Sequence, residues 1–216
     1  MIGQFFLVSR RIKKKVKNIF TDKEDLILDI GCGDAPYYHK SIKGKIVGFD
    51  ISEHESLHVR GSADMLPFKK KTFDKIISVN SFYYFKNPFS VAEGLANILK
   101  KDGKLIAVIP FFYPIHDVPH DKYRFTEYGI REILESNFEV QRVETIGGIF
   151  NIPAIMIHSL IKGGPLIFSG IAKKIAKVIL IIFYPLYFIA QIFSLLDFLD
   201  KTKRFPTYYF IEARKK

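Results

Sequence analysis

Short apolar runs of strand length alternate with segments of helical periodicity along most of the chain. Within DLILDI, KIVGFD and KLIAVIP the apolar residues follow one another instead of alternating with polar ones. Strands of this kind are typical of a parallel sheet that is covered on both faces. The runs lie at residues 25–30, 45–50, 56–61, 73–80, 104–110, 138–143 and 206–214. The pattern therefore predicts an α/β fold, with the run at 56–61 as its weakest strand.

Helical periodicity appears before, between and after these strands. Residues 5–20 combine an apolar stripe with lysines and arginines, which predicts a basic amphipathic helix that either packs on the domain or lies on an anionic surface. Residues 88–103 have an apolar helical face, and Gly103 is the expected helix stop. Thr126 is the expected N-cap of a helix that continues to residue 137.

A far more apolar segment, residues 148–203, separates the last two strands. Its stretch Val178–Leu196 has 19 residues without a charge, close to the length that spans a bilayer. A single crossing is excluded if both flanking strands belong to one sheet, because the chain must return to its starting side. Basic residues flank the apolar runs, as anionic headgroups would favour, so we expect a monotopic or re-entrant helical pair. A helical cap over the active site and a dimer interface are the alternatives.

Composition adds information about charge and compartment. The chain is 48% hydrophobic and has a formal net charge of +11, which favours an anionic partner or reflects lysines that serve solubility. Cys32 is the single cysteine, so no intrachain disulfide can form, and we expect a reducing, cytoplasmic compartment. The first residues lack the order of a signal peptide. Cys32 itself is interpreted as a packing residue.

A glycine-rich turn follows the first strand. Gly31 and Gly33 would let a ligand approach the backbone, and Asp50 ends the next strand at the position where an acid can accept hydrogen bonds from ribose hydroxyls. A dinucleotide fingerprint would need a third glycine where Pro36 stands, so this ligand is disfavoured. S-adenosylmethionine (SAM), which needs no pyrophosphate cradle, is the other candidate.

Four motifs in order resemble class I SAM-dependent methyltransferases, in particular the type 11-like subgroup. They are LDIGCGDAPY, VGFDIS, the stretch from GSADMLPF to FKNP, and LKKDGKLIAVIPF. The resemblance implies a Rossmann-like, mostly parallel sheet of seven strands in the order 3-2-1-4-5-7-6, with the last strand antiparallel. Together with the basic helix and the apolar segment described above, it divides the chain into a basic helix at 1–22, a SAM-binding core at 23–147, the hydrophobic helical insertion at 148–203 and the final strand at 204–216.

The resemblance assigns cofactor-binding roles to the first motif. Asp29 is expected to organise the methionine part of SAM through hydrogen bonds. Gly31, Gly33 and Ala35 are expected to form the turn under the cofactor; Ala35 stands where the family often has a third glycine. Ordinary turn capping is the alternative role for the acidic residues.

The later motifs assign the rest of the cofactor site. By resemblance, Asp50 binds the ribose hydroxyls, and Asp64 meets the adenine amino group with the Met65 backbone beside it. Asn80, at the end of the fourth strand, lines the methionine side. No metal is expected.

The loop after the fifth strand should face the methyl group, because ligands of open parallel sheets lie beyond the carboxyl ends of the strands. His116 or His120 could remove a proton from the acceptor, with Asp121 orienting the base. The alternative is that these residues only cap turns. Tyr83 and Tyr84 are further candidates for the pocket wall.

Together these observations predict a SAM-dependent methyltransferase whose acceptor is a small or amphiphilic molecule, most plausibly a hydroxyl on a lipid or a lipid-linked sugar. The enzyme would be cytoplasmic, either free or peripheral or monotopic at an anionic membrane surface. The alternatives are a non-catalytic SAM- or lipid-binding module and an RNA methyltransferase. Nucleic acid is disfavoured because no Asn/Asp-Pro-Pro-Tyr motif follows the fourth strand.

Overall fold

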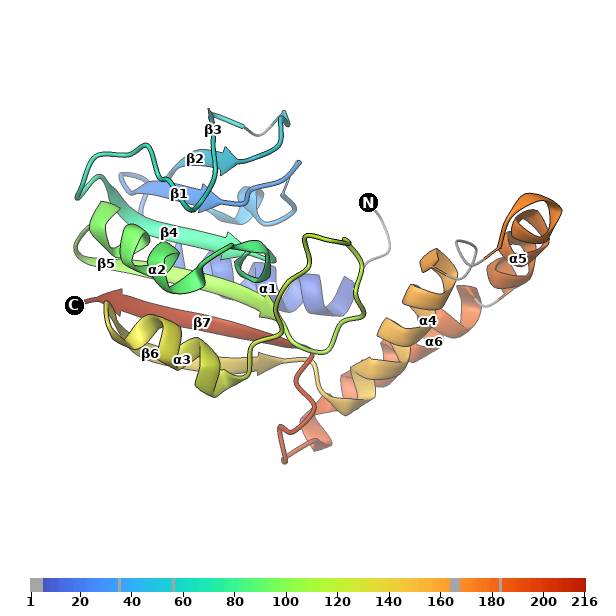
Figure 1. Ribbon diagram of the computed structural model, residues 1–216. Helices are drawn as coiled ribbons and strands as arrows, with labels where there is room; N and C mark the ends of the chain where they lie inside the picture. Colours follow the sequence, from blue (N-terminus) through green and yellow to red (C-terminus); the bar gives the residue numbers. More distant parts are fainter. Residues whose placement is uncertain (1–5, 35, 56, 164–167, 183) are drawn as a thin grey trace.

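A seven-stranded sheet runs through the centre of the protein in the order β3-β2-β1-β4-β5-β7-β6 (Figure 1). The computed structural model describes residues 6–34, 36–55, 57–163, 168–182 and 184–216. All neighbouring strands pair in parallel except β7, which is antiparallel to both β5 and β6. The predicted α/β class, strand order and inserted last strand are therefore confirmed. The strands are β1 (Leu26–Ile30), β2 (Lys45–Asp50), β3 (Val59–Arg60), β4 (Phe73–Val79), β5 (Leu99–Pro110), β6 (Phe138–Ile146) and β7 (Tyr208–Lys215).

Two helices cover one face of the sheet. They are α2 (Pro88–Ile98), capped by the Asn87 side chain, and α3 (Glu127–Glu135), capped by Thr126 as predicted. The expected helix stop at Gly103 is wrong: α2 ends at Ile98, and the chain enters β5 directly at Leu99. Leu99 is fully buried and pairs with Phe73 of β4, so sheet pairing and burial override the helical pattern here.

The basic amphipathic helix α1 (Phe6–Ile19) covers the opposite face. Its apolar stripe, Val8, Ile12 and Val16, is buried in one cluster with residues of β1, β4, β5 and β7. The stripe is therefore part of the protein core and is not available to a lipid surface. Two of its cations also pair within the protein, Lys15 with Glu144 and Arg11 with Asp197.

The insertion forms a helical arm, residues 149–199, that projects away from the sheet (Figure 1). Helix α4 packs against α6 through Ala154, Tyr187 and Ala190, a small cluster separate from the two cores of the sheet. The arm consists of η3 (Ile149–Asn151), α4 (Ile152–Gly163), α5 (Gly170–Ile182), α6 (Tyr184–Phe193) and η5 (Ser194–Leu199). Its projection disagrees with the alternative of a cap folded over the active site.

In the described residues, no helix by itself combines the length and the apolar character needed to cross a bilayer. The segments Gly170–Leu180 and Tyr184–Leu199 are long and apolar enough only when they are taken together. The chain bends by 46° at the break between them.

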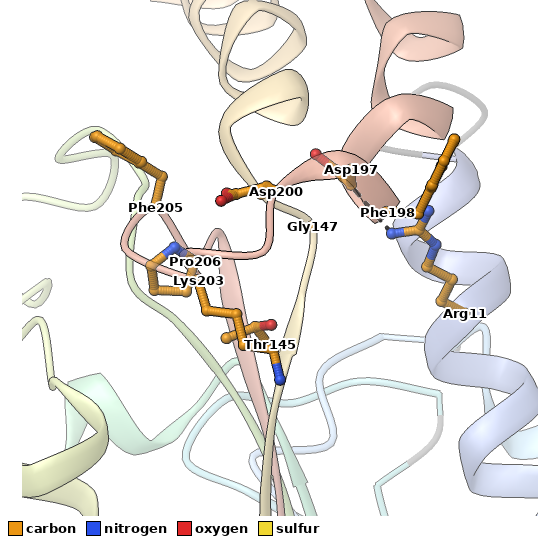
Figure 2. A pocket seen from close by; sticks show the side chains of 10 residues that line it. Arg11, Thr145, Gly147, Asp197, Phe198, Asp200, Lys203, Phe205 and Pro206 are labelled. Carbon is orange, nitrogen blue, oxygen red and sulfur yellow. Dashed lines mark ion pairs between the residues drawn. The ribbon is translucent and has the colours of Figure 1, made fainter.

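The base of the arm is fixed by polar contacts around a cavity of about 250 Å³ (Figure 2). Arg11 Nη1 lies 3.6 Å from Asp197 Oδ2, and Arg11 Nη2 donates to the Ser194 carbonyl at 3.4 Å. The amide of Ile149 donates to Asp200 Oδ2 at 3.3 Å, at the start of the arm. Burial raises the pKa of Asp197. The contacts of Arg11 join the arm to α1, and the contact between Ile149 and Asp200 joins the two ends of the arm.

Candidate functional site

A cavity of about 700 Å³ lies at the carboxyl ends of β1, β2 and β4. Its wall includes Gly33, Asp50, Asp64 and Asn80, four residues that the sequence singled out. The turns after neighbouring parallel strands meet at this edge, which is where open α/β sheets bind ligands. The sequence-predicted cofactor residues are thus brought to one site, although not all of them reach its wall.

The two positions Gly31 and Gly33 of the first motif require glycine for different physical reasons. Both have a positive φ, +71° at Gly31 and +56° at Gly33. A Cβ on Gly31 would lie 2.3 Å from Ser81 Cβ, so this glycine is needed for packing within the protein. A Cβ on Gly33 would meet no protein atom within 4 Å and would instead occupy open space at the cavity. Only Gly33 thus fits the expected role of leaving room for a ligand. Ala35, the third turn residue of the prediction, lies outside the described residues.

Asp50 stands at the end of β2 with its carboxylate at the cavity wall. Its Oδ2 accepts from the Gly33 amide at 3.0 Å, and its Oδ1 accepts from the Ser52 amide at 2.9 Å. Each carboxylate oxygen can accept a second bond, so vicinal hydroxyls could bind without displacing these amides. Sequence reasoning missed Ile51, whose apolar side chain lines the same wall and is 66% exposed. Its position directly after the strand-ending acid was the available signal.

Asp64 also reaches the cavity, but its predicted neighbour does not. Asp64 Oδ1 accepts from the backbone N–H of Asn87 at 3.3 Å, and Asp64 Oδ2 accepts from Ser62 Oγ at 3.2 Å. The Met65 amide donates to the Ser62 carbonyl at 3.0 Å, and the Met65 side chain is 79% exposed outside the cavity wall. The Met65 backbone N–H, which was expected beside Asp64, is thus used by the turn that presents Asp64.

Asp29 lies behind the cavity wall, fully buried. Its Oδ2 accepts from the Tyr38 hydroxyl at 2.9 Å and lies 2.5 Å from His39 Nε2. Burial raises the pKa of Asp29, and the contact with His39 partly offsets this effect. Tyr38 itself lines the cavity, so Asp29 can influence a ligand there only through Tyr38 or the backbone. Asp29 is therefore placed behind the wall, and its expected hydrogen bonds to the methionine part of SAM stay a prediction.

Asn80 marks the junction between this cavity and a second one. It has a φ of +58°, and its backbone N–H donates to the Val108 carbonyl at 2.8 Å. Its side-chain Oδ1 is buried and has no hydrogen-bond partner among the described residues. Both cavities include Asn80 in their walls. A buried acceptor without a partner is costly, so Asn80 Oδ1 is a candidate to accept a hydrogen bond from a ligand.

The second cavity, about 260 Å³, is lined largely by aromatic side chains. Helix α1 closes one side of it with Val8 and Ile12. The ring-bearing residues are Tyr37, Tyr83, Tyr113, His116 and Tyr208. Burial raises the pKa of the Tyr83 and Tyr208 hydroxyls well above the ordinary value, so they remain neutral hydrogen-bonding groups. This cavity suits an uncharged molecule with a few polar atoms.

His116 forms the polar end of this cavity. Its Nδ1 lies 3.0 Å from Asp121 Oδ2 and 3.2 Å from the Pro114 carbonyl, which favours a proton on Nδ1. Its Nε2 lies 3.2 Å from the Tyr83 hydroxyl and 3.3 Å from the Tyr84 hydroxyl. Nε2 is then an acceptor that faces the cavity.

Asp121 is held by Arg124, a residue of the same loop. Arg124 Nη2 donates to Asp121 Oδ2 at 2.8 Å, and the Asp121 side chain is almost fully buried. The hydrogen bond from Arg124 lowers the pKa of Asp121, so this carboxylate stays ionised. Arg124 also donates to the Tyr113 carbonyl, which ties the loop together.

The structure separates the two candidate histidines. Asp121 pairs with His116, whereas His120 is exposed at the edge of the first cavity, where its amide donates to the Asp117 carbonyl at 2.7 Å. Within the described ranges, no three His, Cys, Asp or Glu side chains are grouped as metal ligands. Burial raises the pKa of Cys32 to about 12, so its thiol stays protonated at neutral pH.

Part of the chain is similar in sequence to known proteins. Residues 28–107 match the family model described as a methyltransferase domain. The mouse protein named arginine-hydroxylase NDUFAF5, mitochondrial, is 30% identical over 115 residues, which cover 47% of this chain and 33% of the mouse protein. The chain thus spans about a third of that relative's length. It spans 47% of an uncharacterized protein of Methanocaldococcus jannaschii, MJ1252, to which it is 30% identical.

Solved structures share the fold over most of the chain. The [4+2]-cyclase SpnF is similar with a TM-score of 0.63 and 16% identity, covering 95% of this chain and 80% of SpnF. Phosphoethanolamine N-methyltransferase 2 of Haemonchus contortus, solved with S-adenosyl-L-methionine, has a TM-score of 0.59 and 14% identity, covering 95% of this chain and 52% of that one. At these identities the likeness establishes a common fold.

Proposed function

Because the chain carries a methyltransferase domain with the class I fold, we propose that it is a SAM-dependent methyltransferase that acts on a hydroxyl group. The observation that carries this proposal is the meeting of two cavities at Asn80. One cavity has the groups that a nucleoside and an amino acid require, and the other has a histidine paired with a buried carboxylate.

The first cavity fits SAM group by group. Asp50 can accept from the ribose hydroxyls, and the apolar side chain of Ile51 can cover one face of the adenine. Asp64 presents an acceptor for the adenine amino group. The open space at Gly33 leaves room for the cofactor against the backbone, and the partnerless Asn80 Oδ1 can accept from the ammonium group. SAM would supply the methyl group. The positively charged sulfur that carries this methyl group is an excellent leaving group.

The second cavity supplies what the acceptor needs. His116 Nε2 can take the proton of a hydroxyl that occupies the cavity, because Nδ1 is directed to Asp121. The ionised Asp121 would stabilise the resulting imidazolium, and Arg124 keeps that carboxylate in place. The chain's main contribution is alignment of the acceptor with the methyl group, because the displacement must be in line.

The acceptor is proposed to be an uncharged small molecule or an amphiphile, such as a lipid or a lipid-linked sugar. Its hydroxyl end would enter the tyrosine-lined cavity, where phenol rings and hydroxyls can surround an uncharged ring or chain. The apolar surface of the arm, which leaves the same edge of the sheet, supports an amphiphile.

Calorimetry with SAM tests the cofactor assignment. We expect wild type to bind SAM and Asp50→Ala to bind about 5- to 150-fold more weakly, the effect of losing about 1–3 kcal/mol of charge-assisted hydrogen bonding. Glu132→Ala, a change of an exposed acid on α3, serves as the matched control and should bind like wild type. Correctly folded wild type that binds no SAM would contradict the methyltransferase assignment.

Incubation with radiolabelled SAM and fractionated cell extract tests the reaction. Label in the lipid or small-molecule fraction is the expected result, and label in nucleic acid would instead favour an RNA methyltransferase.

A second candidate is a SAM- or lipid-binding module without methyl transfer. The observation that favours it is that similar proteins bear the names arginine-hydroxylase and [4+2]-cyclase. SAM binding without transfer of label to any fraction would support this candidate.

A further inference from the structure

The three α-helices of the arm have a largely apolar surface, and their charged residues are all positive. From Thr145 to Leu196 the sequence contains no aspartate or glutamate and four lysines. Among the described side chains of the arm, apolar ones are exposed on all three α-helices, including Leu160, Val178 and Ile192. Such a surface needs a cover, because exposed apolar patches of this extent are rare on free proteins.

Helix α5 has an exposed apolar face that is flanked by lysines. Ile171, Ile175 and Val178 are 76%, 54% and 63% exposed, and their spacing places them on one face. By the same geometry Lys173 lies on the opposite side of the helix, whereas Lys174 lies beside Ile171 and Val178 at the edge of the apolar face. A basic amphipathic helix with its apolar face unpaired is typical of the interface between lipid headgroups and acyl chains.

Helix α6 shows where the protein side of the arm lies. Tyr187, Ala190 and Gln191 are buried toward α4, whereas Phe188 and Ile192 are more than half exposed. The arm is therefore held together by contacts between α4 and α6, and the residues on its outer side are exposed. It can remain folded while another apolar phase covers the outside.

We propose that the arm is a monotopic anchor, with the exposed apolar faces of α5 and α6 buried in an anionic lipid leaflet and the lysines of α5 at the headgroups. An anionic leaflet supplies both the apolar phase and the countercharge that the arm lacks. A second copy of the chain would instead bring two acid-free, lysine-bearing surfaces together.

The anchor also explains how an amphiphilic acceptor reaches the site, a part of the inference that rests on the proposed function. Burial raises the pKa of Tyr113, and the nearby hydroxyl of Tyr187 in α6 raises it further. Tyr187 acts in the same direction on Tyr208. Ile155 of α4 is buried in one cluster with Ile12 and Tyr208, both of which line the second cavity, so the base of the arm borders the acceptor site. An acceptor dissolved in the leaflet would thus lie next to the cavity.

Vesicle flotation of the full chain tests the anchor. Wild type should float with phosphatidylcholine vesicles that contain phosphatidylglycerol, and high salt should release only part of it. The double variant Ile175→Glu, Val178→Glu should bind at least about tenfold more weakly, because two apolar side chains lose their burial. Phe89→Glu, a matched change at an exposed apolar residue of α2, should float like wild type.

Three results would overturn the proposal: wild type that stays out of the vesicle fraction, a double variant that floats as well as wild type, or a lipid-free dimer that the double variant converts to monomer. SAM affinity, measured on the same samples, separates the two proposals. Flotation without SAM binding would contradict the proposed function alone, and SAM binding without flotation would contradict the anchor alone.

Discussion

At the scale of single residues, Gly31 and Gly33 illustrate how similar sequence positions acquire different physical roles. Gly31→Ala would place a methyl group 2.3 Å from Ser81 Cβ. We expect it to lower the free energy of unfolding by about 2–5 kcal/mol, from the positive φ and the overlap together. Thermal and denaturant unfolding measure this effect.

Gly33→Ala should act on ligand binding instead. The positive φ costs about 1–2 kcal/mol of stability, and the new methyl group meets no protein atom. It would occupy cavity space, so SAM affinity should fall at least about tenfold. A Gly33→Ala protein that binds SAM as wild type does would remove this residue from the cofactor site.

His116 and His120 give the corresponding test for the acceptor site. His116→Ala should lower turnover by about 10²–10⁴-fold with SAM affinity unchanged, because it removes the proposed base. His120→Ala is the matched control, since His120 lies apart from the Asp121 pair and should affect turnover far less. The measurement is label transfer to the fraction that wild type modifies. The opposite ranking of the two variants would assign the base to His120.

At the scale of elements, α1 shows that a basic amphipathic helix can be part of a core. Phe20, directly after α1, is fully buried, and Lys14 on the outer side is exposed. Phe20→Ala should lower the free energy of unfolding by about 3–5 kcal/mol, and Lys14→Ala by less than about 0.5 kcal/mol. Equal, small effects in chemical unfolding would show that the segment is not held on the sheet.

Most elements could be predicted from sequence, because continuous apolar runs and Thr126 are local signals of strands and of a helix start. The junction at Leu99 could not, because its burial beside Phe73 is a contact between distant residues. The same reasoning applies to the site. Asp50 and Asn80 lie at strand ends, which fixes their place, whereas Asp29 and Met65 depend on how Tyr38 and a local turn are arranged.

At the scale of the whole molecule, the arm is an insertion that the core should survive losing. β6 and β7 are antiparallel neighbours, and Ile146 pairs with Tyr208, so a short linker in place of Gly148–Asp200 would close an ordinary hairpin. We expect the shortened protein to stay folded and to bind SAM within about threefold of wild type, while it loses vesicle binding. Circular dichroism and calorimetry check the first two outcomes. Unfolding of the shortened protein would show that the arm is part of the folding unit.

The direction of the arm could not be predicted from the sequence. An insertion that is apolar on nearly all sides indicates burial but not against what, so the cap, the anchor and the dimer interface all remained open. The contacts of Arg11 with Asp197 and Ser194 orient the base of the arm, and they join residues from opposite ends of the chain.

The position of β7 between β5 and β6 has a consequence for biosynthesis. About 60 residues separate β6 from β7, and they comprise the arm and its connections. At about 5–20 residues per second, a ribosome needs about 3–12 s to make them. Until β7 is made, β6 has no neighbouring strand and the edge of β5 is open. The arm precedes β7 in the chain and is therefore completed first. The nascent chain could therefore reach a lipid surface before its catalytic domain closes, so that targeting precedes the final step of folding.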